Sequence, residues 1–164
     1  MKKLVCFILA CCLACCFVGC DGGEEPSTGG ESSTPVVENY SEGLEYLQKA
    51  DGSYSVTGVG TCTDAEIVIP ATYQNKPVVE IAENAFALTD AIISVEIPAS
   101  VTAINPNAFY MCLGLESVVF KDAQGWIAKE LDTLVTGVNL ELTDAAQAAT
   151  LLKDTYRAYY WRKS

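Results

Sequence analysis

The sequence predicts an α+β solenoid, a fold in which short units of one strand and one turn stack on one another. Three observations support this fold: a 23-residue internal repeat, a hairpin signal before the repeat and a helix pattern after it. So few units cannot bury their own open ends, because each unit hides its apolar face only against a neighbour. We therefore expect an N-terminal β-hairpin cap and a C-terminal helix cap.

The N-terminus has the organisation of a secretory signal peptide. Two lysines precede an apolar run from Leu4 to Gly19, and Cys20 follows. The run falls short of the roughly 20 apolar residues that a membrane span needs. A cleaved leader over residues 1–19 therefore fits better than a transmembrane anchor.

The stretch from Phe17 to Cys20 resembles a bacterial lipobox, in which a signal peptidase cuts before a cysteine that carries diacylglycerol. Phe17 stands where the family usually has Leu, and Cys15 and Cys16 are rival acceptors. The polar stretch directly after Cys20 favours that site. The resemblance implies lipidation of Cys20 and a membrane-anchored protein on the bacterial surface.

Charge becomes more negative once the leader is set aside. Removing its two lysines from 10 basic and 21 acidic residues leaves a formal net charge of 8 − 21 = −13. Such a surface repels phosphate backbones, so we expect no nucleic-acid partner. It is not attracted to an anionic membrane either, which leaves the lipid as the predicted anchor.

Six of the eight cysteines lie in the first 20 residues, so the domain holds only Cys62 and Cys112, too few for a disulfide scaffold. A single bridge between them and two free thiols both remain open, and free thiols are the simpler interpretation.

Residues 20–40 are rich in Gly, Ser, Thr, Pro and Glu and predict a disordered tether. About 20 such residues span on the order of 25 Å. Residues 41–66 follow with alternating polarity on either side of Asp51-Gly52. This pattern predicts strands over 45–49 and 53–58, joined as the hairpin cap.

The repeat is clearest in the tripeptide Asn-Ala-Phe, which occurs at residues 84–86 and again at 107–109. A partial earlier copy, at 66–70, is offset by 28 residues because the insertion 72–76 adds five. Periods of about 20–29 residues are typical of leucine-rich solenoids. A shift of 23 residues pairs Ile81 with Ile104, Asn84 with Asn107, Ala85 with Ala108, Phe86 with Phe109, Ile92 with Leu115, Ser94 with Ser117, Val95 with Val118 and Ile97 with Phe120.

Each unit predicts one strand with one buried face, because apolar residues alternate with others over 94–97 and 117–120. Stacked units would align these strands in a parallel sheet about 4.8 Å apart. We expect Asn84 and Asn107 to cap a short helical turn. The rings of Phe86 and Phe109 should then stack as a ladder in the core.

The stretch SVEIPASVTAINPNAFYMC followed by LESVVF resembles the BspA-like leucine-rich repeats of bacterial surface proteins. The resemblance covers residues 67–120. It implies a leucine-rich repeat fold and a surface or adhesion protein, with a partner that varies among members.

Residues 121–164 predict the C-terminal cap. Two short strands or loops are expected at 122–128 and 136–143, followed by a helix over 144–161. Asp144 and Gln147 form a capping box. The apolar face of this helix contains Ala145, Ala149, Leu152, Tyr156 and Tyr159.

The sequence predicts neither an enzyme nor a cofactor. The chain has no histidine, which removes Ser-His-Asp and Cys-His catalysis and the commonest metal ligand. Glu66 and Glu96 remain formally possible as paired carboxylates, but a solvated face is the simpler role. Calcium is open as well, although no loop has regular acidic spacing.

Two features are candidates for binding. Tyr160 and Trp161 either remain exposed, to stack on a sugar or anchor a protein, or pack across the end of the repeat. The second candidate is the outward strand face, which is either a plain solvent face or a partner surface: Glu66, Val68, Ser94, Glu96, Ser117 and Val119.

We predict a non-catalytic surface lipoprotein that binds a protein or glycan outside the cell. A structural component of a membrane complex is the alternative.

Overall fold

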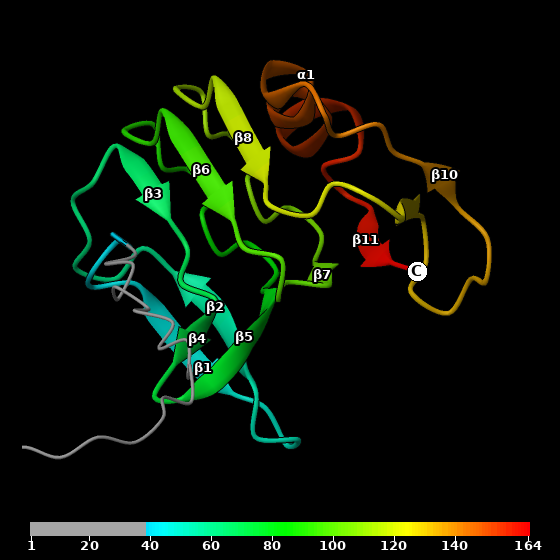
Figure 1. The fold of residues 1–164 in the computed structure, drawn as a ribbon. Coiled ribbons are helices and arrows are strands. Elements are labelled where there is room, and N and C mark those ends of the chain that lie inside the picture. Colours follow the sequence, from blue (N-terminus) through cyan, green and yellow to red (C-terminus); the bar gives the residue numbers. More distant parts are fainter. Residues whose placement is uncertain (1–38) are drawn as a thin grey trace, which may run out of the picture. The chain divides into compact units, whose positions relative to one another are not determined.

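The computed structural model describes residues 39–164, which form two open β-sheets and one short helix (Figure 1). The predicted leader, Cys20 and almost all of the predicted tether lie outside these residues. Within the described part, no helix has the length and apolar character needed to cross a bilayer.

The described residues are mostly strands. In chain order the elements are β1 (Glu45–Gln48), β2 (Tyr54–Gly58), β3 (Glu66–Val68), β4 (Thr72–Tyr73), β5 (Lys76–Ile81), β6 (Ser94–Ile97), β7 (Ala103–Ile104), β8 (Ser117–Phe120), β9 (Trp126–Lys129), β10 (Val138–Asn139), α1 (Ala145–Thr150), the π-helical turn η1 (Leu151–Thr155) and β11 (Tyr160–Lys163).

The repeat strands β3, β6 and β8 form a three-stranded parallel sheet in that order. Val95 of β6 pairs with Val118 of β8 at the predicted 23-residue offset, and with Ile67 of β3 at the predicted 28-residue offset. These three side chains are buried, so the predicted alternation and register are confirmed.

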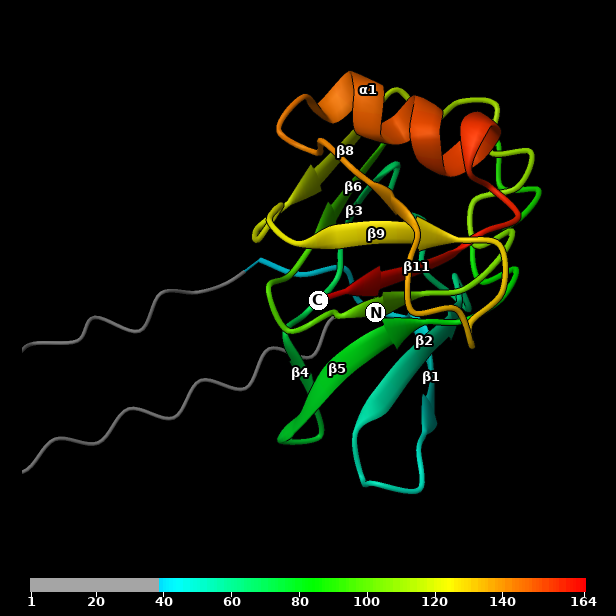
Figure 2. The ribbon, with the colours of Figure 1, turned by 90° about the vertical axis from the view of Figure 1, so that its right-hand side faces the viewer.

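The second sheet has the order β1-β2-β5-β7-β11-β9-β10, with β4 pairing to β5. Its strands β1, β2, β5, β11 and β9 are labelled in Figure 2. Its strands β5 and β7 are parallel neighbours and align Ile81 with Ile104. The second half of each repeat therefore also stacks in register. Apolar side chains from both sheets and from the turns between them share one core.

The predicted phenyl ladder is confirmed. The rings of Phe86 and Phe109 are fully buried and stacked, with centroids 5.1 Å apart and planes inclined by 14°. The Phe86 N–H donates to the carbonyl of Ala108 at 2.8 Å, which joins the two coils through the backbone.

The predicted helix-capping role of Asn84 and Asn107 is wrong. Both residues have φ of 58°, in the left-handed region, and turns rather than helices follow them. Asn enters this region more readily than other residues with a side chain. The N–H of Ala87 donates to the Asn84 carbonyl at 3.1 Å, and this bond closes the turn. Asn therefore repeats because each coil reverses direction at this backbone conformation.

The predicted hairpin is confirmed as β1 and β2, which are antiparallel. Gly52 has φ of 84° and donates its N–H to the carbonyl of Lys49 at 3.0 Å. This is the three-residue loop in which a type I turn ends in a left-handed residue. The Asp51 carboxylate accepts from the Ser53 N–H at 2.9 Å and from its hydroxyl at 2.5 Å, which fixes the turn.

The C-terminal helix is shorter than predicted. Asp144 accepts from the Gln147 N–H at 2.9 Å as expected, and β9 and β10 form the two predicted closing strands. The helix is α1 with η1 and ends at Thr155, whereas Trp161 lies in β11, between β7 and β9. Burial of an indole between two strands outweighs the weak helix propensity of an aromatic residue.

Candidate functional site

The outward positions of the repeat sheet form one continuous surface, here called the strand face: Glu66, Val68, Ser94, Glu96, Ser117 and Val119. The register places Ser94 between Glu66 and Ser117 in one row. It places Glu96 between Val68 and Val119 in a second row. Neighbouring strands in a sheet are about 4.8 Å apart, so a partner could touch all three strands together.

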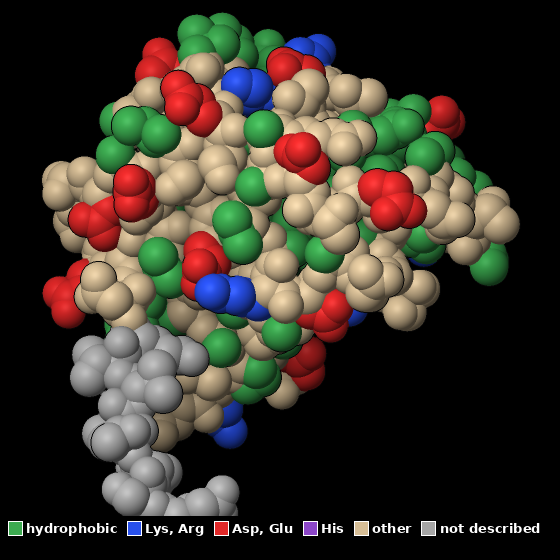
Figure 3. Space-filling model, turned by 45° about the horizontal axis from the view of Figure 1, so that its top comes forward, with side chains coloured by type: hydrophobic (Ala, Val, Ile, Leu, Met, Phe, Trp, Pro, Cys, Tyr) green, Lys and Arg blue, Asp and Glu red, His purple; other side chains and the backbone are tan. Residues whose placement is uncertain are grey.

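The strand face combines apolar and acidic side chains. Val119 is 43% exposed and Ile93, which precedes β6, is 46% exposed, whereas Val68 is half-buried. The Glu96 carboxylate pairs with the Lys121 ammonium at 2.8 Å. Acidic side chains are scattered over the surface in Figure 3, with few basic ones among them. The face can therefore offer apolar contact and hydrogen bonding within an acidic surround.

Two segments lie along the outer strands of this sheet. At β3 the Ser41 N–H donates to the Val68 carbonyl at 2.9 Å, and the Ser41 hydroxyl accepts from the Val68 N–H at 3.1 Å. At β8, α1 lies alongside (Figure 1), and the Lys153 ammonium donates to the Leu115 carbonyl at 2.6 Å. The Ser41 segment thus pairs with the outer edge of β3, and α1 packs beside β8, which leaves the strand face as the accessible side.

The C-terminal aromatic residues do not form an exposed platform, so the prediction of exposure fails for Trp161. Its ring is 1% exposed and lies parallel to the Phe120 ring, with centroids 6.4 Å apart. The Arg162 guanidinium covers the Tyr160 ring at 5.2 Å from its centroid. Trp161 therefore packs at the end of the repeat, whereas Tyr160 is half-buried beneath Arg162.

Both cysteines of the described residues, Cys62 and Cys112, are free thiols. The Cys112 thiol is buried and donates to the carbonyl of Phe86 at 2.8 Å, and burial raises its pKa. Cys62 is half-buried. A neutral buried thiol of this kind acts as a small apolar residue.

Residues 39–164 contain no group of three or more Cys, Asp or Glu side chains arranged to hold a metal ion. The strand face contributes two carboxylates, Glu66 and Glu96, on neighbouring strands. They lie in different rows, and Glu96 is already paired with Lys121.

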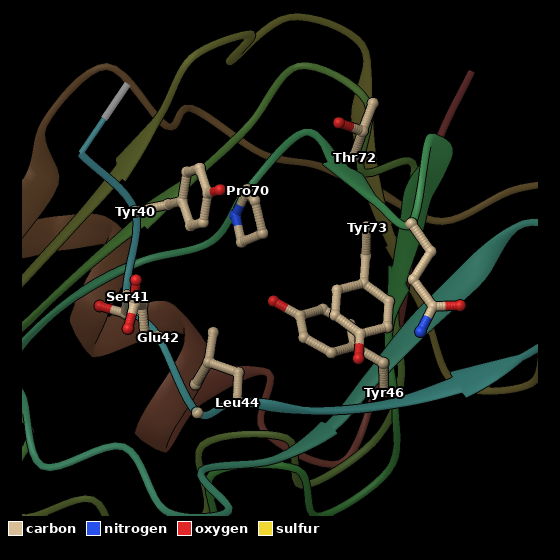
Figure 4. Close-up of a pocket in the computed structure, with 10 residues that line it drawn as sticks. Tyr40, Ser41, Glu42, Leu44, Tyr46, Pro70, Thr72 and Tyr73 are labelled. Atoms are coloured by element: carbon tan, nitrogen blue, oxygen red, sulfur yellow. The ribbon is translucent and has the colours of Figure 1, made fainter. Parts of the chain in front are cut away.

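One feature escapes sequence reasoning: a pocket at the hairpin end, here called the tyrosine pocket. Its walls contain Tyr40, Tyr46 and Tyr73, with Leu44 and Pro70 beside them (Figure 4). These residues come from separate segments, so no local pattern reveals the pocket. The one available signal is the insertion 72–76, which interrupts the repeat period and carries Tyr73.

The repeat region matches a known family. Residues 62–131 match the model of the BspA type leucine-rich repeat region. This part of the chain is a BspA-type leucine-rich repeat region, in agreement with the resemblance of residues 67–120.

Several solved structures are similar over part of the chain. A leucine-rich repeat protein from Bacteroides capillosus is 30% identical, with a TM-score of 0.44, over 48% of this chain and 61% of that one. The T. pallidum leucine-rich repeat protein is 26% identical, with a TM-score of 0.44, over 50% and 38%. A leucine-rich cell surface protein from Faecalibacterium prausnitzii is 30% identical, with a TM-score of 0.44, over 53% and 24%.

The chain covers less than two thirds of each of these three proteins. A comparison with curated proteins finds no match.

Proposed function

We propose that this protein is a non-catalytic lipoprotein of the bacterial surface whose leucine-rich repeat domain binds a protein or a glycan outside the cell. The observation that carries the proposal is the strand face. Its two rows run across β3, β6 and β8 in strict register, with Val119 exposed and Val68 half-buried. Repeat proteins commonly bind partners on such extended surfaces.

The domain organisation supports a short, closed repeat. In this proposal the hairpin β1–β2 and the segment around Ser41 close one end of the repeat, and α1 with β9, β10 and β11 closes the other. The hairpin joins the second sheet through parallel pairing of β2 with β5. At the far end Phe120, Trp126 and Trp161 form an aromatic cluster. Capping of this kind allows a short repeat to be stable.

The proposed location at the cell surface rests on the sequence before the described residues. A leader over residues 1–19 would be removed, Cys20 would carry the lipid, and residues 20–40 would hold the domain away from the membrane. Stable anchoring takes more than one acyl chain, at about 0.8 kcal/mol per buried methylene. A cysteine that carries diacylglycerol holds two acyl chains and satisfies that requirement.

A protein and glycan array probed with the full chain tests the proposed binding role. We expect retention of one class of protein or glycan at micromolar concentration, with loss of retention after heat denaturation. Signals no stronger than those of the denatured chain across the whole array would contradict a role in binding.

The alternative is a structural component of a membrane-associated complex, and the exposed apolar residues of the strand face would suit such a permanent partner equally. Affinity purification from membranes separates the two functions. A single partner recovered in constant ratio from native membranes would favour the structural role, whereas exchangeable extracellular partners would favour the proposed one.

A further inference from the structure

The tyrosine pocket is built by the segment that breaks the repeat. Residues 72–76 contain β4 and a two-residue loop, Gln74-Asn75, which joins β4 to β5. Gln74 and Asn75 both have positive φ, 48° and 60°, as the tightest hairpin loop requires. Since the neighbouring unit does without these five residues, the repeat core does not require them. Their effect is to place Tyr73 against the hairpin.

Tyr73 belongs to a rigid aromatic group. Its ring stacks on Tyr46 with centroids 4.0 Å apart and planes inclined by 13°. The ring of Tyr54 meets both edge-on, at 5.0 Å from Tyr73 and 6.4 Å from Tyr46. The Tyr54 hydroxyl donates to the Gln74 side-chain oxygen at 2.9 Å, which ties the loop to β2. The stacked pair is therefore held in place before any ligand arrives.

The cavity beside this pair has a volume of about 390 Å³. This volume lies at the low end of the range of about 300–1,000 Å³ for small-ligand sites. Tyr40 and Pro70 lie across the cavity from Tyr46 and Tyr73 (Figure 4). The Tyr40 side chain is 53% exposed at the mouth. A ligand made of one or two rings would thus contact the apolar side chains on both sides of the cavity.

The polar groups around the cavity are hydroxyl, amide and carboxylate groups. Thr72 and Glu42 line the cavity and are exposed to solvent, whereas the Ser41 hydroxyl is already bonded to β3. Burial raises the pKa of Tyr46 to about 12. Its hydroxyl is protonated at neutral pH, as an ordinary tyrosine hydroxyl is, and can donate. Of the described residues that line the cavity, none is Lys or Arg. This lining disfavours phosphates and carboxylated ligands.

We propose that the tyrosine pocket binds the terminal one or two residues of a neutral glycan. A pyranose has an apolar C–H face that suits a tyrosine ring and hydroxyl groups that suit a rim of Thr72, Glu42 and phenol oxygens. The mutual stacking of Tyr46 and Tyr73 leaves one face of each ring for a ligand. One face is sufficient for a pyranose, and it would also attract an organic cation, so choline is a comparator in the test.

This site is separate from the strand face, since none of the six strand-face residues lines the pocket. The two proposals can therefore fail independently. If substitutions in the strand face abolish binding on the array and Tyr40→Ala does not, the result supports the strand face as a binding surface and leaves the tyrosine pocket to its own test.

The test is a titration followed by NMR of the full chain with labelled tyrosines, in a polyoxyethylene detergent that carries neither sugar nor choline. The probes are neutral disaccharides of glucose, galactose and mannose, with sialyllactose and choline as comparators. The chain has 8 tyrosines, which single Tyr→Phe variants assign. We expect one neutral disaccharide to shift the ring signals of Tyr40, Tyr46 and Tyr73 at about 1 mM or below.

Tyr40→Ala should weaken this binding at least about tenfold while leaving the melting temperature unchanged, because the Tyr40 side chain is exposed. Tyr110→Ala is the matched control: its half-buried ring packs under Arg157 and lies outside the pocket lining. Three outcomes overturn the proposal: no disaccharide shifts these signals at about 10 mM, choline shifts them when disaccharides do not, or Tyr40→Ala binds as tightly as Tyr110→Ala.

Discussion

The phenyl ladder predicts a large and specific loss of stability when one ring is removed. Phe86 and Phe109 are each 0% exposed and stack at 5.1 Å. Phe→Ala at such a site costs about 3–5 kcal/mol, because the lost transfer free energy adds to the energy of the cavity left behind. Single domains have only about 5–15 kcal/mol in total, so either variant should lose a large part of the free energy of unfolding.

The assay is urea and thermal unfolding followed by circular dichroism. We expect Phe86→Ala to lower the melting temperature by roughly 10 °C or more, at about 4 °C per kcal/mol. Tyr110→Ala is the control beside Phe109, and its half-buried ring should cost far less. Because the two phenyl rings touch, the double variant should deviate from additivity by about 0.5 kcal/mol or more. Losses below about 1 kcal/mol for both single variants would refute the ladder as the centre of the core.

Three further predictions concern lipidation at Cys20, the turn at Asn84 and the pairing of Asp122 with Lys163. Cys20→Ala should abolish lipid modification, measured by intact mass of the membrane fraction, whereas Cys112→Ala should leave it unchanged. Asn84→Gly should keep the stability of the parent and Asn84→Ala should lose about 1 kcal/mol in urea unfolding, since φ is 58°. The Lys163 ammonium, followed by the Gln124 N–H, holds the pKa of Asp122 below its usual range. That stabilisation is present above the pKa that Asp122 has in the unfolded chain and is lost as the pH falls through its pKa in the folded chain. Asp122→Asn should therefore lower the melting temperature at neutral pH, and the difference from the parent should disappear on acidification.

The parts of the fold that follow local rules could be predicted from the sequence. Alternation fixed which side of β6 and β8 is buried, and the 23-residue repeat fixed how Val95 and Val118 align. The Asp51-Gly52 turn is equally local, because Gly52 adopts a left-handed φ. Such features depend on a few neighbouring residues or on a copy of the same unit, so pattern and periodicity are sufficient.

The parts that depend on distant contacts could not be predicted. The Tyr160–Lys163 strand carries residues that continue a helical pattern, but pairing of Trp161 with β7 and β9 buries the indole more fully. Asn84 suits both a helix cap and a left-handed turn, and the sequence alone cannot separate these roles. The tyrosine pocket joins three segments around Tyr40, Tyr46 and Tyr73, which only the folded chain brings together.

For the candidate site, the sequence supplied the surface but not its occupant. The six strand-face positions lie in two rows across neighbouring strands, as the alternation required. Their use as a binding surface stays a prediction, because exposure and register describe what a partner could contact and not which partner does.

The most direct measurement of the central claim is the affinity of an array-identified partner for two charge variants. Ser117→Arg places a long cation on β8, at one end of a row of the strand face, whereas Gln48→Arg places the same side chain on exposed β1 in the other sheet. If the strand face binds the partner, Ser117→Arg should raise the dissociation constant by tenfold or more, about 1.4 kcal/mol, with Gln48→Arg unchanged. Equal affinities for both variants and the parent, with equal melting temperatures, would contradict the claim.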